Sequence, residues 1–209
     1  MNEHPDPDFI VLHTLRCSGA ASTERLAASV GPLTSADTED TLLGLAARGL
    51  VTHDRGVFGG WRLTAAGHDA DSEWIAVELT RADARTDVHA AYGDFLDLNQ
   101  RTLDICSAWQ VRSFEPLVLN DHTDRAYDTG VLRRLAAVDA QAQAVCARLA
   151  ARLHRFSHYG PRLAAALDRA RQGELDQVAD SLDSYHAVWF RLHEDLLVTL
   201  GIDRDGAAR

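Results

Sequence analysis

The chain has 209 residues, of which 46% are hydrophobic and 25% are charged, and this is the composition of an ordinary globular protein. Its formal net charge of −10 disfavours indiscriminate nucleic-acid binding, because contacts with phosphate supply most of the non-specific affinity. No stretch approaches the roughly 20 apolar residues of a membrane span, and the acidic N-terminus lacks the features of a signal peptide. We therefore expect a cytoplasmic protein with no membrane partner.

Apolar residues at helical spacing predict a first helix from Phe9 to Arg16 and a second helix that begins after the cap residue Ser22. The Gly-Pro pair at positions 31 and 32 ends the second helix. A third helix is expected from Thr34 to Arg48, followed by a glycine in the left-handed conformation. The second and third helices together predict a helix-turn-helix.

A short β-hairpin is predicted directly after the third helix. Leu50 to His53 has the pattern of a strand, Arg55 to Gly60 is a turn rich in glycine, and Trp61 to Thr64 is the returning strand. Thr64 then caps the helix that follows. A hairpin in this position predicts a winged helix.

The run Leu45–Val51 (LAARGLV), the glycine-rich tip and the run Trp61–Gly67 (WRLTAAG) resemble the signature of MarR-like and PadR-like winged-helix transcriptional regulators. The resemblance covers residues 8 to 70. It implies a dimer that binds double-stranded DNA, with the helix from Thr34 in the major groove and the Arg55–Gly60 tip beside the backbone or the minor groove. The residues expected to contact DNA are Arg25, Thr34, Ser35, Thr38, Thr41, Arg55 and Arg62.

The predicted recognition helix also carries three acidic residues, Asp37, Glu39 and Asp40. Carboxylates close to DNA phosphates cost electrostatic free energy unless they point away or pair with a cation. The alternative interpretation is therefore a winged helix that contacts another protein and does not bind DNA. Whether arginines or carboxylates dominate the exposed surface distinguishes the two interpretations.

The rest of the chain is predicted to be helical, so the expected fold is mainly α. Residues 71 to 112 form a long helical linker and dimerisation region with a break between Thr80 and Asp87. Residues 113 to 202 form an antiparallel helical bundle together with the preceding helix. The expected elements of that part are a loop over Ser113–Asp124 and helices over about Thr129–Ser157, Arg162–Arg171 and Ser184–Gly201. By the same resemblance, the dimer contact is placed on Trp74, Ile75, Val77 and Leu79.

The predicted bundle contains more aromatic side chains with a polar tip than a plain leucine core needs. Such side chains can line a pocket for a small-molecule effector, and they can equally satisfy one another as a buried network. The residues that would bind such a ligand are Tyr92, Asn99, Trp109, Tyr185, His186 and Trp189.

Four histidines of the same region are candidates for binding a divalent metal ion. His154 and His158 are four residues apart near the end of a predicted helix, and His186 and His193 are two turns apart on another. Structural or surface histidines are the alternative. The three cysteines, Cys17, Cys106 and Cys146, lie in apolar helical patterns and are expected to be buried free thiols.

Motifs of catalysis are absent from the sequence: there is no nucleophile elbow, no P-loop and no dinucleotide-binding glycine pattern. We therefore expect a dimeric DNA-binding transcriptional regulator that is not an enzyme. Its helical C-terminal part would serve dimerisation and could sense a small ligand. The alternatives are a protein-interaction module and a metal-responsive regulator.

Overall fold

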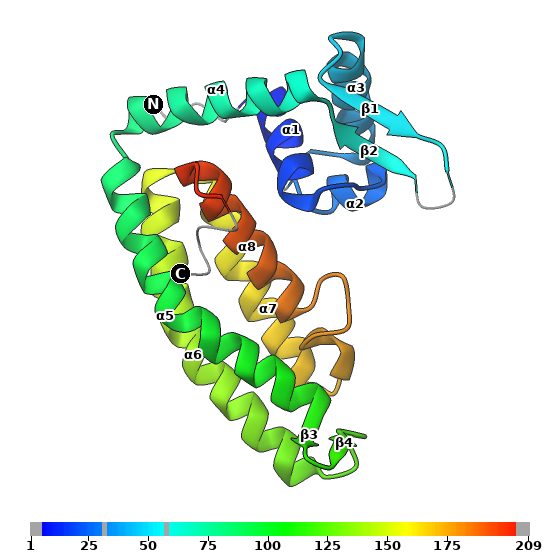
Figure 1. Ribbon diagram of the computed structural model, residues 1–209, viewed down its shortest axis with the longest axis vertical. Coiled ribbons are helices and arrows are strands. Elements are labelled where there is room, and N and C mark those ends of the chain that lie inside the picture. Colours follow the sequence, from blue (N-terminus) through cyan, green and yellow to red (C-terminus); the bar gives the residue numbers. More distant parts are fainter. Residues whose placement is uncertain (1–5, 31–32, 57–58, 204–209) are drawn as a thin grey trace. The chain divides into compact units, whose positions relative to one another are not determined.

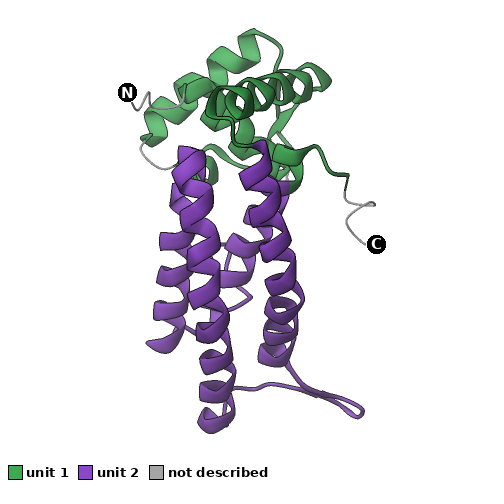
Figure 2. Cartoon of the chain, turned by 90° about the vertical axis from the view of Figure 1, so that its left-hand side faces the viewer, with its two compact units in different colours: residues 1–84, 197–209 green, residues 85–196 purple. Residues whose placement is uncertain are grey.

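A computed structural model describes residues 6–30, 33–56 and 59–203 of the chain. The protein is mainly helical, as predicted, with two small antiparallel sheets of two strands each. Residues 1–84 and 197–209 form one compact unit, the head unit, and residues 85–196 form a second, the helical unit (Figure 2). The division falls inside the helical region predicted for residues 71–112.

Three helices open the head unit: α1 (Pro7–Ser18), α2 (Thr23–Ala27) and α3 (Ser35–Ala47). Each begins after a side chain that accepts a hydrogen bond from a free backbone N–H of the first turn, which is the preferred chemistry of a helix start. Their inner faces form one apolar core with the hairpin. The buried members of this core are Val11, Leu12, Leu15, Ala21, Leu26, Val30, Leu42, Leu45, Val51 and Trp61.

The predicted hairpin consists of β1 (Val51–Asp54) and β2 (Gly60–Leu63) (Figure 1). Ala21, between α1 and α2, pairs with Trp61 through two backbone hydrogen bonds of 3.2 and 2.9 Å, which the sequence did not predict. A Cβ atom on Gly60 would lie 2.8 Å from the Ala21 carbonyl oxygen, so this close approach requires glycine. Residues 57 and 58 of the predicted tip, like the helix-ending pair at 31 and 32, lie outside the described residues.

Helix α4 (Ala65–Ala82) follows the hairpin, and the hydroxyl of Thr64 caps it as predicted. It ends at Asp83, which has a left-handed φ of 46°, inside the predicted break. The dimer contact placed on this helix needs correction, because Ile75 and Leu79 are already buried within the chain and cannot meet a partner. Of that set, Val77 is exposed.

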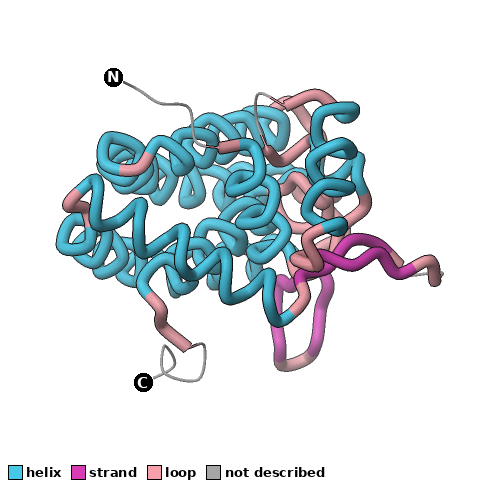
Figure 3. The backbone as a smooth tube through the Cα atoms, turned by 90° about the horizontal axis from the view of Figure 1, so that it is seen from above, coloured by secondary structure: helices cyan, strands magenta, loops and turns pink. Residues whose placement is uncertain are grey.

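The helical unit contains α5 (Arg85–Gln110), α6 (Arg125–Arg152), α7 (Tyr159–Arg171) and most of α8 (Tyr185–Leu200) (Figures 1 and 3). Helix α6 returns beside α5, and the two short 3₁₀ helices η1 (His154–His158) and η2 (Leu175–Gln177) flank α7. None of the helices in the described part of the chain is long and apolar enough to cross a membrane.

The segment predicted as a loop between α5 and α6 forms a second hairpin, β3 (Val111–Phe114) and β4 (Leu117–Leu119). Its apolar side chains are largely exposed. The sequence of this segment therefore shows no alternation of buried and exposed residues from which a strand could be predicted. The third long helix also ends five residues earlier than predicted, at Arg152, and η1 continues the chain.

The start of α3 yields a prediction for stability. Thr34→Ala removes the hydroxyl that accepts the Asp37 N–H at 3.1 Å, and it should lower the free energy of unfolding by about 1 kcal/mol in urea denaturation. Ser35→Ala is the matched control, because this neighbouring hydroxyl is exposed and makes no hydrogen bond within the described residues. Equal losses in the two variants would contradict the role of the cap.

Candidate functional site

Three arginines on α2 and the hairpin are exposed and form no ion pair within the described residues: Arg25 in α2, Arg55 after β1 and Arg62 in β2. Arg62 lies opposite Thr52 on the exposed face of the hairpin, whose other face buries Trp61. All three were predicted to contact DNA, and the fold leaves their guanidinium groups accessible.

The elements that carry these arginines are joined to one another. The Trp61 indole donates a hydrogen bond of 3.1 Å to the Thr23 hydroxyl at the start of α2, in addition to the backbone pairing of Trp61 with Ala21. Helix α2 and strand β2 therefore form one piece of structure, and Arg25 and Arg62 project from it.

Two other arginines of the head unit are used inside the fold. Arg16 binds the buried Asp71 carboxylate at 2.9 Å, and Arg48 binds Asp8 at 2.6 Å. Arg48 is the C-cap residue of α3, so the charge at this end of the helix is partly neutralised by Asp8.

The hydroxyls predicted to read DNA from α3 are mostly committed to the helix itself. Thr34 donates to the Asp37 carboxylate at 2.6 Å in a capping box, and these hydrogen bonds lower the pKa of Asp37. Thr38 is fully buried and donates to the Thr34 carbonyl, while Thr41 donates to the Asp37 carbonyl. Thr38 is therefore not available to DNA, because helical periodicity turns it inward, and Ser35 has the least restricted hydroxyl.

The solvent face of α3 carries carboxylates and one large apolar side chain. Asp37, Glu39 and Asp40 are exposed, and Leu43 is 55% exposed. No Arg, Lys, Asn or Gln, the side chains that most often bond to base edges, occurs between the first and last residues of this helix. Direct base readout by α3 therefore lacks its usual donors.

In the helical unit, part of the predicted ligand-binding set forms a buried network. The Trp189 indole donates to the Asn99 side chain at 2.9 Å, and its ring stacks on Phe95 with the centroids 4.4 Å apart. The Tyr185 ring also stacks on the Trp189 ring, with the centroids 6.4 Å apart. The polar tips of Asn99 and Trp189 thus satisfy each other.

The other members of that set lie in different surroundings. Trp109 is fully buried and donates to the Leu175 carbonyl at 3.1 Å, and His186 is half-buried. The Tyr92 hydroxyl is buried and has no hydrogen-bond partner within the described part of the chain, and burial raises the pKa of Tyr92. The Tyr92 ring stacks on Phe95 and so adjoins the network of Asn99, Tyr185 and Trp189, and ligand binding by the six residues stays a prediction.

A titratable group that the sequence did not single out, Asp139, lies in the interior of the helical unit. Burial raises the pKa of its carboxyl group, against a hydrogen bond from Gln143 that lowers it. Burial, followed by the charge of Asp139, also raises the pKa of Tyr185. In the sequence, Asp139 interrupts a stripe of buried apolar residues on α6, and this interruption could have indicated a buried carboxylate.

All three cysteines are buried free thiols, as predicted. In the helical unit, burial raises the pKa of Cys106 and of Cys146 to about 12. These two thiols are therefore protonated and unreactive near neutral pH.

The four histidines proposed as metal ligands do not come together. Within the described residues, no three of His154, His158, His186 and His193 lie close enough to share an ion. His154 and His158 belong to the 3₁₀ helix η1, in which residues three apart share a face, so a spacing of four separates them. For this pair the helical spacing on which the prediction rested is absent, whereas His186 and His193 both lie on α8 as predicted.

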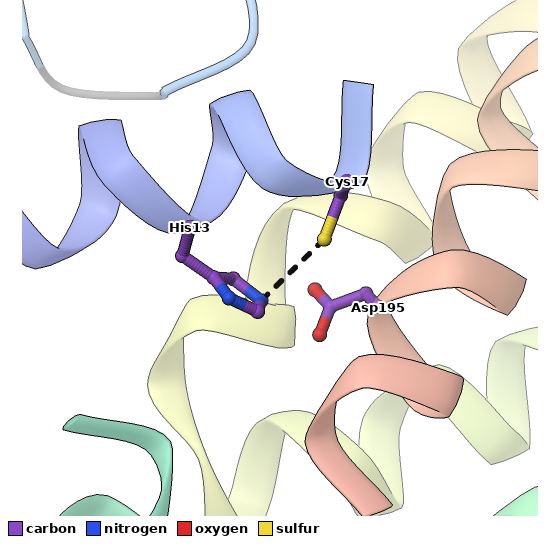
Figure 4. Close-up of side chains that lie close together, drawn as sticks. All are labelled: His13, Cys17 and Asp195. Atoms are coloured by element: carbon purple, nitrogen blue, oxygen red, sulfur yellow. Dashed lines mark hydrogen bonds between the residues drawn. The ribbon is translucent and has the colours of Figure 1, made fainter. Parts of the chain in front are cut away.

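A cluster that the sequence analysis missed joins α1 to α4 in the head unit. The His13 ring lies 3.0 Å from the buried Asp71 carboxylate through Nδ1, and its Nε2 lies 3.6 Å from the Cys17 sulfur (Figure 4). Arg16 binds the second oxygen of the same carboxylate. The signal in the sequence was a histidine and a cysteine four residues apart on the apolar face of the first helix.

Comparisons with known proteins identify no relative: no known protein family, curated protein sequence or solved structure matches the chain.

Acid should destabilise the helical unit through His158. Burial lowers the pKa of this histidine to about 4 in the folded protein, whereas the ordinary value is 6.5. The unfolded chain therefore binds the proton first, and stability is lost as the pH falls from about 6.5 toward 4. Relative to His158→Gln, the wild type should lose roughly 3 kcal/mol of unfolding free energy between about pH 7 and pH 4.

Urea denaturation at a series of pH values measures this difference. Ser157→Ala, at an exposed position of the same 3₁₀ helix, removes no titratable group and is the control, which should leave the pH dependence of the wild type unchanged. Parallel stability curves for wild type and His158→Gln would show that His158 does not titrate in this way.

Proposed function

We propose that the head unit is a winged-helix domain that binds double-stranded DNA, and that the protein is a dimeric transcriptional regulator. The observation that carries the proposal is the contrast among the arginines of this unit. Arg16 and Arg48 are bound to carboxylates, whereas Arg25, Arg55 and Arg62 are exposed with no ion pair within the described residues. These three are the ones expected to contact DNA from the resemblance to MarR-like and PadR-like regulators, and a further exposed arginine of the unit, Arg81, lies at the end of α4 and is not among them.

The order and pairing of the elements support this proposal. Three helices precede a hairpin, the hairpin pairs with the segment between the first two helices, and a capped helix follows. In a winged helix the hairpin contacts the DNA backbone or the minor groove, and Arg55 and Arg62 lie in and beside such a hairpin here. The helical unit, as an antiparallel bundle, would hold two heads at the spacing of two half-sites, roughly 34 Å.

Phosphate contacts dominate the proposed interaction, because α3 offers few donors to base edges. A single head would bring only three exposed arginines to the duplex, and a net charge of −10 opposes the approach. A dimer doubles the number of contacts on one duplex. Binding should therefore depend strongly on both dimerisation and salt concentration.

Removing an arginine from the hairpin tests the proposal. Arg62→Ala should weaken binding to DNA from the promoter region of its own gene by on the order of 1 kcal/mol per subunit, because a phosphate contact is lost. The slope of log K against log salt should become shallower by roughly 2 for the dimer, at about 0.9 per contact. Fluorescence polarisation at several salt concentrations, with competitor DNA present, measures both quantities.

Arg81→Ala is the matched control, since Arg81 is an exposed arginine near the far end of α4 from the hairpin. It should change neither the affinity nor the slope. If the wild-type dimer shows no salt-dependent binding that resists competitor, the proposed function fails.

A second candidate function is supported by the exposed face of α3. Its combination of carboxylates with Leu43 fits a contact with a basic and apolar protein surface better than a contact with phosphates. In this alternative, the winged helix is a protein-interaction module.

Neutralising the acidic face distinguishes the two functions. If α3 lies against DNA, the variant Glu39→Gln with Asp40→Asn should bind DNA more tightly, by on the order of 1 kcal/mol for each carboxylate within about 4 Å of a phosphate. If α3 contacts a protein partner, the DNA affinity of this variant should equal that of the wild type. Fluorescence polarisation at low salt measures the difference, and Glu73→Gln, at an exposed position of α4, is the control.

A further inference from the structure

His13 and Cys17 occupy successive turns of α1 and point the same way (Figure 4). Residues four apart on an α-helix are neighbours on one face, which brings the ring nitrogen Nε2 within 3.6 Å of the sulfur. Both residues are buried, at 5% and 8% exposure. The pair therefore presents one nitrogen and one sulfur atom to the same small volume.

This separation fits two ligands of one tetrahedral metal ion. With a Zn–N bond of about 2.1 Å, a Zn–S bond of about 2.3 Å and a tetrahedral angle, the two ligand atoms lie about 3.6 Å apart. The observed distance between His13 Nε2 and Cys17 Sγ is 3.6 Å. The separation of the two ligand atoms is thus that of two ligands in a tetrahedral site.

The surroundings of His13 are those of a metal-binding histidine. Histidine ligands usually donate the hydrogen of the other ring nitrogen to a carboxylate or carbonyl group, which fixes the tautomer and orients the ring. Here Asp71 Oδ1 lies 3.0 Å from Nδ1, so the proton is held on Nδ1 and the lone pair of Nε2 faces Cys17. Arg16 binds Asp71 Oδ2 at 2.9 Å and balances the charge of this carboxylate.

We propose that His13 and Cys17 bind a divalent transition-metal ion of the zinc and cobalt class. A thiolate and an imidazole together favour such ions over magnesium or calcium, which prefer oxygen ligands. On binding, the Cys17 S–H bond breaks, the sulfur bonds to the ion, and the proton passes to solvent. The pair supplies two positions of the coordination sphere, and water or further protein atoms supply the others. The proposal does not depend on DNA binding.

The metal-responsive behaviour considered from the sequence would thus belong to the head unit and not to the histidines of the helical unit. An ion bound to α1 beside Asp71 would reinforce the contact between α1 and α4, because Asp71 lies on α4.

Titration of the reduced full-length protein with Co²⁺ tests the site. A cobalt–thiolate bond gives an intense charge-transfer absorption in the near ultraviolet, and we expect this band to saturate at one ion per chain. Cys17→Ser should abolish the band, and His13→Gln should weaken the affinity at least tenfold. Cys146→Ser removes another buried free thiol and is the matched control, which should titrate as the wild type does.

Asp71→Asn tests whether Asp71 orients the His13 ring, because this substitution keeps the size of the side chain. It should lower the Co²⁺ affinity between about 10-fold and 100-fold, while the charge-transfer band remains. Circular dichroism checks that each variant is folded. No charge-transfer band in the wild type, or a band that survives in Cys17→Ser, would overturn the proposal.

Discussion

Asp71 is fully buried in the head unit, and its two carboxylate oxygens bind Arg16 and His13 of α1. Burying a carboxylate without partners is so unfavourable that removing one partner of such a pair typically costs roughly 3–5 kcal/mol. The interaction therefore fixes α4 against α1 at one register, and α4 begins directly after the hairpin. The positions of the hairpin, its arginines and the His13–Cys17 pair all depend on this contact.

Some charged side chains of the head unit pair with one another within the fold, and others are exposed on its surface. Carboxylates bind Arg16 and Arg48, and the capping box uses Asp37, so these groups have structural partners. The exposed arginines with no ion pair within the described residues lie on α2, the hairpin and the end of α4, and exposed carboxylates lie on α3 but also on α2, β1 and α4, at Glu24, Asp54 and Glu73 among others. In the proposed DNA complex the hairpin would therefore contribute more contacts than α3, which carries no arginine, and the carboxylates of α3 are the reason that a protein partner is the second candidate.

The interior of the helical unit is built from aromatic side chains whose polar tips are partly satisfied inside the fold. Trp189 binds Asn99 and Trp109 binds the Leu175 carbonyl, so neither indole needs a ligand to complete its hydrogen bonds. Burial keeps the thiols of Cys106 and Cys146 protonated, so their chemistry is that of small apolar side chains. These contacts account for much of the composition that suggested an effector pocket.

Local chemistry allowed several features to be predicted from the sequence. Ser22, Thr34 and Thr64 begin their helices because a hydroxyl there satisfies free backbone N–H groups, and this depends only on neighbouring residues. The mainly helical fold, the hairpin after α3 and the break before α5 follow from patterns of the same short range. The β3–β4 hairpin was missed because its apolar residues are exposed and show no inward face.

The candidate sites depend on contacts between residues that are far apart in the chain. Only the tertiary structure determines such contacts. Asp71 is 58 residues from His13, and no local pattern indicates that its charge is buried against α1. The same holds for the pairing of Ala21 with Trp61. His154 and His158 do not share a helix face for a related reason: helical spacing predicts neighbours only while the helix continues, and α6 ends at Arg152.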